Sequence, residues 1–292
     1  PDAFIAFCGS LNASNQTIQS AENGHIGFGW GLSSSVQSFV GNFNANGQAV
    51  QVAKRRQRTD TLLEWFDGSA TLARATYQGP LAGGGFRLNW SDVHANRPYA
   101  FGFAIKGPRF AQAVTTQKTS TGNDDVTGAS FDPEAVLEMS DCNVADSAIV
   151  ANARFSFGGV AGAALNQGVI WAGDSDAFDT TRARCDLDRT RIVQMMTEDT
   201  PTTQAEASVS AWLTGGYRRN WTTADATARQ ILSLLIGPAA TAVAGSSTAA
   251  GAHESLLPGS ASPAGALEAL EFSLGGSGGG RKLVFPQPSF RR

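Results

Sequence analysis

The sequence is poor in charge and has no long apolar run. Of its 292 residues 16% are charged and 42% are hydrophobic, with a formal net charge of −3 and a pI of about 5.6. A weakly acidic chain has no general attraction to nucleic acid or to an anionic membrane surface. No stretch of about 18 apolar residues occurs, so we expect no membrane insertion.

Histidine and cysteine are also scarce, with 3 of each. His25, His94 and His253 lie far apart and form neither HExxH nor another paired-histidine spacing of the kind that zinc sites use. No GxSxG elbow marks a nucleophilic serine, and no glycine-rich loop has the spacing of a phosphate-binding loop. We therefore expect no enzyme, no metal and no cofactor.

The cysteines show no CxxC spacing, and three cysteines cannot pair completely. Cys8, Cys142 and Cys185 are expected to be free buried thiols, with a Cys142–Cys185 bridge as the alternative.

Two pairs of acidic residues fall in predicted turns, Asp124 with Asp125 and Asp174 with Asp176. Solvated turn acids are the expected role, rather than the carboxylate pair of a glycosidase. A calcium-binding loop around Asp174–Asp176 stays open as an alternative.

What the chain does contain is a duplication, which has to be found before local structure is assigned. The stretch Gly84–Ser91 (GGFRLNWS) recurs 131 residues later as Gly215–Thr222 (GGYRRNWT). Further blocks match in the same order at nearly the same offset: Pro1–Ile5 with Pro133–Leu137, Phe28–Gly31 with Phe155–Gly158, Gln57–Leu63 with Asp188–Val193, and Tyr99–Ile105 with Ile231–Ile236. We predict two tandem copies of one domain, residues 1–108 and 109–238, followed by a tail over 239–292.

Both copies consist of short apolar or alternating runs separated by Gly, Asn, Asp and Pro, which predicts about seven strands per copy. The predicted fold is all-β, with two tandem antiparallel β-sandwich repeats of jelly-roll-like type and an extended C-terminal arm. The one helix candidate, Thr223–Leu235, is rejected because Pro98 stands in the equivalent part of the first copy.

The two copies differ at their starts. The second has a lead-in, residues 110–132, for which the first has no counterpart. We therefore expect the first copy to be N-terminally shortened and to expose an unpaired strand edge, which proteins ordinarily cover.

Some residues are candidates for binding. Lys54, Arg55, Arg56 and Arg58 form the densest basic cluster, which could meet an acidic neighbouring subunit or a polyanionic glycan, or could lie on a solvated hairpin. Trp30 and Trp65 are weak candidates for stacking on a sugar.

Two further tryptophans belong to the duplicated stretch. Asn89-Trp90-Ser91 and Asn220-Trp221-Thr222 match a glycosylation sequon, but their recurrence within a repeated strand favours packing, so Trp90 and Trp221 are expected in the core.

The tail begins with a connector rich in Ala, Gly, Ser, Thr and Pro over residues 239–265. A first apolar strand is predicted over 266–274, a glycine link over 275–280 and a second apolar stretch over 281–285. We predict that this arm docks on a sheet edge, in the same or a neighbouring subunit, by strand addition. The residues expected to make the contact are Leu270, Phe272, Leu274, Leu283, Val284 and Phe285.

The stretches Arg219–Arg229 (RNWTTADATAR) and Thr121–Val136 (TGNDDVTGASFDPEAV) resemble a repeat module of virion proteins from tailed bacteriophages, such as tail-fibre, minor tail and structural proteins. The resemblance implies a virion structural protein, tail-associated as a fibre, spike or tip, with copies of itself and other virion proteins as partners. Contact with a host-surface glycan is a further implied role. The alternatives are a capsid decoration protein and a carbohydrate-binding adhesion module. No catalytic residues belong to these motifs.

Overall fold

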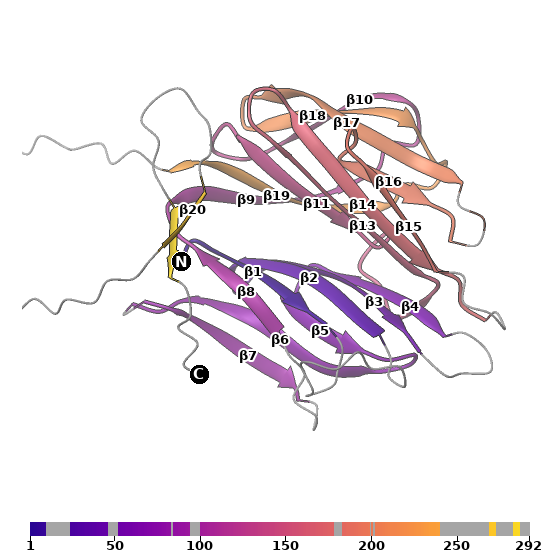
Figure 1. Cartoon of the computed structure of the whole chain (residues 1–292), viewed down its shortest axis with the longest axis horizontal. Helices are drawn as coiled ribbons and strands as arrows, with labels where there is room; N and C mark the ends of the chain where they lie inside the picture. The colour runs from indigo at the N-terminus through magenta and orange to yellow at the C-terminus, as the bar shows by residue number, and fades with distance from the viewer. Residues whose placement is uncertain are drawn as a thin grey trace, which may run out of the picture. The chain divides into compact units, whose positions relative to one another are not determined.

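A computed structural model describes residues 1–9, 24–45, 52–82, 84–93, 100–177, 183–198, 200, 202–239, 269–272 and 283–286 (Figure 1). Every regular element in this part of the chain is a β-strand, which confirms the all-β prediction. The chain divides into two compact units, Pro1–Ala242 and Val243–Arg292. The larger unit holds both copies of the duplication.

The first copy forms two antiparallel sheets. Sheet A has the order β4-β3-β2-β1-β8, and the short strand β12 of the second copy extends it beside β4. Sheet B has the order β5-β6-β7. The strands are β1 (Ala3–Cys8), β2 (Gly24–Ser33), β3 (Val36–Asn44), β4 (Ala53–Arg58), β5 (Leu63–Phe66), β6 (Thr71–Pro80), β7 (Phe86–Asp92), β8 (Ala100–Ile105) and β12 (Val150–Ala151).

The second copy repeats this arrangement and adds one strand to each of the two sheets. Sheet C has the order β15-β14-β13-β11-β19-β9, and sheet D has the order β10-β18-β17-β16. The strands are β9 (Pro108–Thr116), β10 (Gly122–Thr127), β11 (Ala135–Ser140), β13 (Ala153–Ala161), β14 (Asn166–Asp174), β15 (Arg184–Asp188), β16 (Val193–Met196), β17 (Thr203–Leu213), β18 (Gly216–Thr223) and β19 (Gln230–Ala239).

Strand order relates the copies element by element. The series β4-β3-β2-β1-β8 corresponds to β15-β14-β13-β11-β19, and β5-β6-β7 corresponds to β16-β17-β18. Strands β9 and β10 have no counterpart in the described part of the first copy. Consecutive strands lie side by side as meanders, so the order does not show the two Greek keys of a jelly roll.

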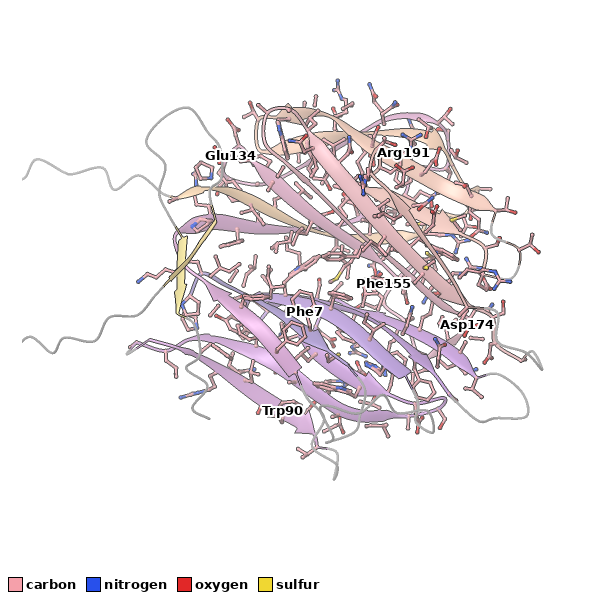
Figure 2. The ribbon with its side chains drawn as sticks, in the orientation of Figure 1. Phe7, Trp90, Glu134, Phe155, Asp174 and Arg191 are labelled. Carbon is pink, nitrogen blue, oxygen red and sulfur yellow. The ribbon has the colours of Figure 1, made fainter. Side chains whose placement is uncertain are left out.

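Three apolar clusters hold the larger unit together. The first lies between sheets A and B and includes Phe39, Trp65 and Tyr77. The second lies between sheets C and D and includes Trp221. The third lies between sheets A and C and is composed chiefly of Trp30, Val40, Met139, Phe155, Leu232 and Leu234. The two sandwiches therefore pack through their larger sheets, and Figure 2 shows Phe7 and Phe155 on the facing sides of sheets A and C.

The pairing register corrects one of the sequence matches. Phe7 on β1 lies opposite Phe28, and Met139 on β11 lies opposite Phe157, so Phe28 corresponds to Phe157 rather than to Phe155. The match of Phe28–Gly31 with Phe155–Gly158 was therefore wrong by two residues. A shift of two keeps every side chain on its own face of the sheet, so the apolar pattern could not reveal it.

The other local predictions have mixed outcomes. Residues 230–239 form strand β19, which agrees with the rejection of a helix there. All three cysteines are free, so the alternative Cys142–Cys185 bridge is not formed. Cys8 and Cys142 are buried as expected, whereas Cys185 is exposed on β15, at the end of sheet C.

His25 is buried between sheets A and B beside Trp65 and Phe66, with ring centroids 6.4 Å and 5.0 Å away. Burial lowers its pKa to about 3, because no water stabilises the imidazolium. The pKa in the unfolded chain is about 6.5, so His25 contributes its full stability above that pH. This stabilisation is lost as the pH falls from about 6.5 towards 3, because in that range His25 is protonated in the unfolded chain but stays neutral in the folded protein.

Another buried group acts with the opposite sign. Burial raises the pKa of Asp141 from 3.8 to about 6, so its protonation stabilises the folded protein as the pH falls through that window. Both the native protein and the variant His25→Leu contain Asp141, so the difference between their stabilities does not include its contribution. We expect the stability of the native protein to fall by about 2 kcal/mol more than that of His25→Leu between pH 7 and pH 5, as measured by urea unfolding. Parallel pH profiles for the two proteins would disprove the assignment.

Candidate assembly interface

The basic cluster on β4 joins the two copies. Lys54 forms an ion pair with Asp176 at 2.6 Å. Arg55 is buried and donates to the carbonyl oxygens of Ala151 at 2.8 Å and Asn152 at 2.6 Å. Both contacts reach residues of the second copy, so these cations serve the interface between the sandwiches.

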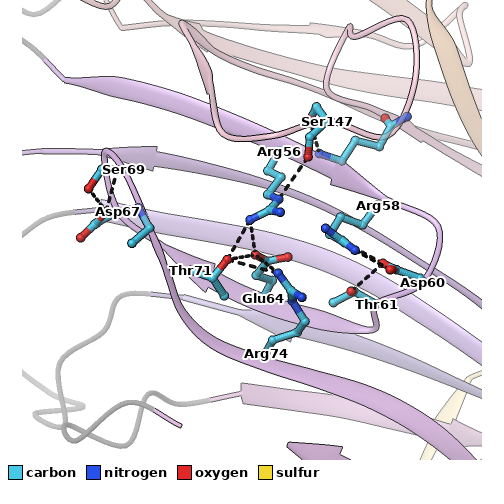
Figure 3. Close-up of polar contacts among 12 residues, drawn as sticks. Arg56, Arg58, Asp60, Thr61, Glu64, Asp67, Ser69, Thr71, Arg74 and Ser147 are labelled. Atoms are coloured by element: carbon cyan, nitrogen blue, oxygen red, sulfur yellow. Dashed lines mark hydrogen bonds and ion pairs between the residues drawn. The ribbon is translucent and has the colours of Figure 1, made fainter. Parts of the chain in front are cut away.

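The other two arginines of the cluster have partners as well. Arg56 pairs with Glu64 at 2.6 Å and donates to the carbonyl oxygen of Ser147 at 3.2 Å (Figure 3). Arg58 forms an ion pair with Asp60, in which Nε lies 2.6 Å from Oδ1. The cluster is neither a solvated hairpin nor an unoccupied basic surface for a polyanion, because the segment from Asn143 to Asn152 of the second copy lies against it.

The proposed sugar-stacking residues are in the interior. Trp30 is buried and its Nε1 donates to Gln112 Oε1 at 3.0 Å, and buried Trp65 donates to the carbonyl oxygen of Gly9 at 3.0 Å. Neither side chain offers an exposed ring face. The structure therefore does not support a binding role for Trp30 or Trp65.

The acidic pairs are also engaged. Asp176 accepts hydrogen bonds from the backbone N–H of Ala53 at 2.9 Å and from Lys54. Asp124 and Asp125 pair with arginines of β18. Within the residues that the structure describes, no three His, Cys, Asp or Glu side chains form a group that could hold a metal. No helix there is long and apolar enough to cross a membrane.

The duplicated tryptophans have different environments. Trp221 is 1% exposed, as expected for a core residue, but Trp90 is 42% exposed on β7 (Figure 2). The core prediction was therefore correct for Trp221 and wrong for Trp90. The cause is β10, which lies beside β18 and pairs Gly122 with Trp221. No described strand lies on that side of β7.

Strand β10 also neutralises charge in the second copy. Asp125 lies opposite Arg218, and the two form a bidentate pair at 2.6 Å and 2.8 Å. Arg87 holds the place of Arg218 in the first copy, where it is exposed and pairs with no described acid. The outer side of β7 thus presents a single unpaired cation.

The backbone around the duplicated glycines shows the same difference. A Cβ atom on Gly216 would lie 1.9 Å from the carbonyl oxygen of Val126 in β10. A Cβ atom on the equivalent Gly85 would have no described atom within 4 Å. In the second copy the backbone of β10 fills this space, and in the first copy no described residue does.

The outer side of β8 is apolar and uncovered. Phe101 and Phe103 are 65% and 51% exposed, whereas their counterparts Leu232 and Leu234 are both 0% exposed. The leucines are flanked by β9, which pairs with β19, and are covered by residues of sheet A. Phe101 stacks on Phe7 with ring centroids 4.9 Å apart, so an aromatic surface continues from sheet A towards this edge.

We call the outer sides of β7 and β8, with Arg87, Trp90, Phe101 and Phe103, the open edge. Both strands are terminal in their sheets, although their counterparts β18 and β19 are internal. An unpaired strand offers backbone N–H and C=O groups to an added strand.

The predicted arm residues lie in the smaller unit. Strands β20 (Ala269–Phe272) and β21 (Leu283–Pro286) form a two-stranded antiparallel sheet that contains Leu270, Phe272, Leu283, Val284 and Phe285. Leu274 lies outside the described residues. The docking of this arm stays a prediction.

Comparison with known proteins gives no relative. No protein-family model, no curated protein and no solved structure matches the chain. The resemblance to virion modules of tailed phages therefore rests on the sequence stretches quoted above.

Proposed function

We propose that this protein is a non-enzymatic structural component that assembles with copies of itself through the open edge. The observation that carries the proposal is the exposure of Phe101 and Phe103 on β8, which continue an aromatic surface from Phe7. The sequence resemblance supports the further proposal that the assembly is the virion of a tailed bacteriophage, with the protein at the tail.

The larger unit has the rigid construction expected of a structural subunit. Its two sandwiches are held together by apolar side chains between sheets A and C and by the polar contacts of β4. The second copy covers its own equivalent strands with β9 and β10. Among the described strands, β7 and β8 are terminal in sheets B and A, and β10 and β9 are terminal in sheets D and C.

Strand addition would use both parts of the open edge. Main-chain hydrogen bonds would form along β7 and β8, as they do along β18 and β19. Burying an exposed phenylalanine contributes about 1.5–3 kcal/mol, so Phe101 and Phe103 together can support a stable contact.

The test places charge on the apolar part of the edge. We expect the native protein to self-associate with rising concentration in sedimentation velocity, and the double variant Phe101→Lys, Phe103→Lys to remain monomeric at the same concentrations. Because both side chains are exposed, the folding stability should be nearly unchanged.

Ile170→Lys is the matched control, because Ile170 is an exposed apolar residue on an internal strand of sheet C. It should associate like the native protein. A native protein that stays monomeric, or a double variant that assembles normally, would contradict the proposal.

A further inference from the structure

We infer that Phe101 and Phe103 meet the same two side chains of a second molecule across a two-fold axis, so that the first product of assembly is a symmetric dimer. This inference rests on the proposed function and names the surface that the partner contributes. The two side chains project from one face of sheet A, and the contacts of that face indicate which partner it fits.

The exposed phenylalanines lie on the face of sheet A that packs against sheet C. In the pairing of β8 with β1, Phe101 lies opposite Phe7, and Phe103 lies opposite a residue of the same face, Ile5. Ile5 packs against the apolar cluster between sheets A and C. The exposed side chains are therefore part of the surface through which the two sandwiches are joined.

Ring contacts connect Phe101 with that interface. Phe101 stacks on Phe7, whose ring centroid lies 4.8 Å from that of Phe28. Phe28 stacks on Phe155 and Phe157 of sheet C, with centroids 5.0 Å away in both cases. Phe7 and Phe155, which this series of rings connects, lie on the facing sides of the two sheets (Figure 2). A partner at Phe101 would extend an interface that the protein has already formed.

The sheet across this interface is a duplicate of sheet A. Its strand β19 is the counterpart of β8, with Leu232 and Leu234 in the places of the two phenylalanines. Both leucines are buried in the cluster that contains Trp30 and Val40 of sheet A. In the second sandwich, this position of the repeated sheet is thus covered by the inner face of sheet A.

A second molecule offers the same face at its own Phe101 and Phe103, because the part around Trp30 and Val40 is already covered by sheet C. Strand β8 has the sequence AFGFAI, so two such strands meet without repulsion and without burying a charge. A contact between identical surfaces is isologous and closes around a two-fold axis.

Opposite charges at these positions test the symmetry in the full chain. The double variant Phe101→Lys, Phe103→Lys and the double variant Phe101→Glu, Phe103→Glu should each fail to self-associate, because each then faces its own charge. We expect an equimolar mixture of the two to associate at least about tenfold more tightly than either alone, since lysines meet glutamates whichever way the four side chains pair. In sedimentation velocity, the native and the mixed complexes should reach twice the mass of one chain and grow no further.

Ile170 provides the control, because it forms another exposed apolar pair with Leu187, which lies opposite it on β15. If the phenylalanines met this pair instead, each molecule would leave one surface free and an open chain would form. We expect Ile170→Lys, Ile170→Glu and their mixture all to dimerise like the native protein.

The outcomes separate this inference from the proposed function. If the two double variants are monomeric and their mixture stays monomeric, or if the native protein grows beyond a dimer, assembly at the open edge stands and the two-fold contact is refuted. Loss of association in the Ile170 variants would also refute it and would identify the surface of Ile170 and Leu187 as the partner. If the native protein never self-associates, both proposals fail.

Discussion

Replacing Arg219 by alanine should lower the free energy of unfolding by about 3–5 kcal/mol, because it leaves a buried carboxylate without its cation. Arg219 is fully buried on β18 between two acids, Asp124 at 2.7 Å and Glu138 at 3.4 Å. Its guanidinium also lies 5.6 Å from the ring centroid of Trp221. Burial disfavours the charge of Arg219, but Glu138 and the other nearby negative groups outweigh it and raise the pKa.

The loss should depend on pH. Burial raises the pKa of Glu138 above its usual range, and Arg219 opposes that rise. Without Arg219 the pKa of Glu138 rises further, so the folded variant binds a proton more readily than the unfolded chain does. Lowering the pH through this window should therefore restore part of the lost stability.

The neighbouring residue provides the control. Arg218 is also on β18 and also pairs with an aspartate, but the side chains of Arg218 and Asp125 are 37% and 43% exposed. Arg218→Ala should leave the urea midpoint almost unchanged, since exposed ion pairs contribute little. Equal effects of the two substitutions would refute the view that Glu138 depends on Arg219.

The second large effect is expected at a glycine where two sheets meet. A Cβ atom on Gly158 would lie 1.9 Å from the carbonyl oxygen of Ile192, which belongs to the chain entering sheet D. Backbone on both sides leaves little freedom to adjust, so we expect Gly158→Ala to destabilise the protein by about 3 kcal/mol or more. Gly29→Ala should act alike in the first copy, where the distance to the carbonyl oxygen of Leu62 is also 1.9 Å.

Gly159 is the matched control for this prediction. A Cβ atom there would lie 3.1 Å from a methyl group of the Leu137 side chain, which can rotate away. Thermal unfolding should therefore show a small shift for Gly159→Ala and a large one for Gly158→Ala. The opposite ranking would contradict the close approach of Gly158 to the carbonyl oxygen of Ile192.

The duplication made the strands predictable. Gly and Pro punctuation with apolar runs located β1 to the residue and excluded a helix before β19. The positions of these strands could be predicted because they depend on the local sequence of apolar and turn-forming residues.

The burial of individual side chains could not be predicted in this way, because it depends on contacts with strands that are distant in the sequence. Trp90 and Trp221 lie in nearly identical stretches, yet their exposure differs because only one has a neighbouring strand. Arg55 looked like a surface cation because the sequence gives no sign that Ala151 and Asn152 lie against it. Trp30 is buried for the same reason, since its partner Gln112 belongs to the other copy.

Amide hydrogen exchange tests the role of the open edge most directly. Peptides covering residues 86–92 and 100–105 should be compared with those covering 184–188 and 193–196, at protein concentrations below and above the onset of assembly. We predict that assembly slows exchange in β7 and β8 and leaves the terminal strands β15 and β16 unchanged, because new main-chain hydrogen bonds form only at the open edge. Unchanged exchange in β7 and β8, or protection that arises at β15 or β16 instead, would contradict the account.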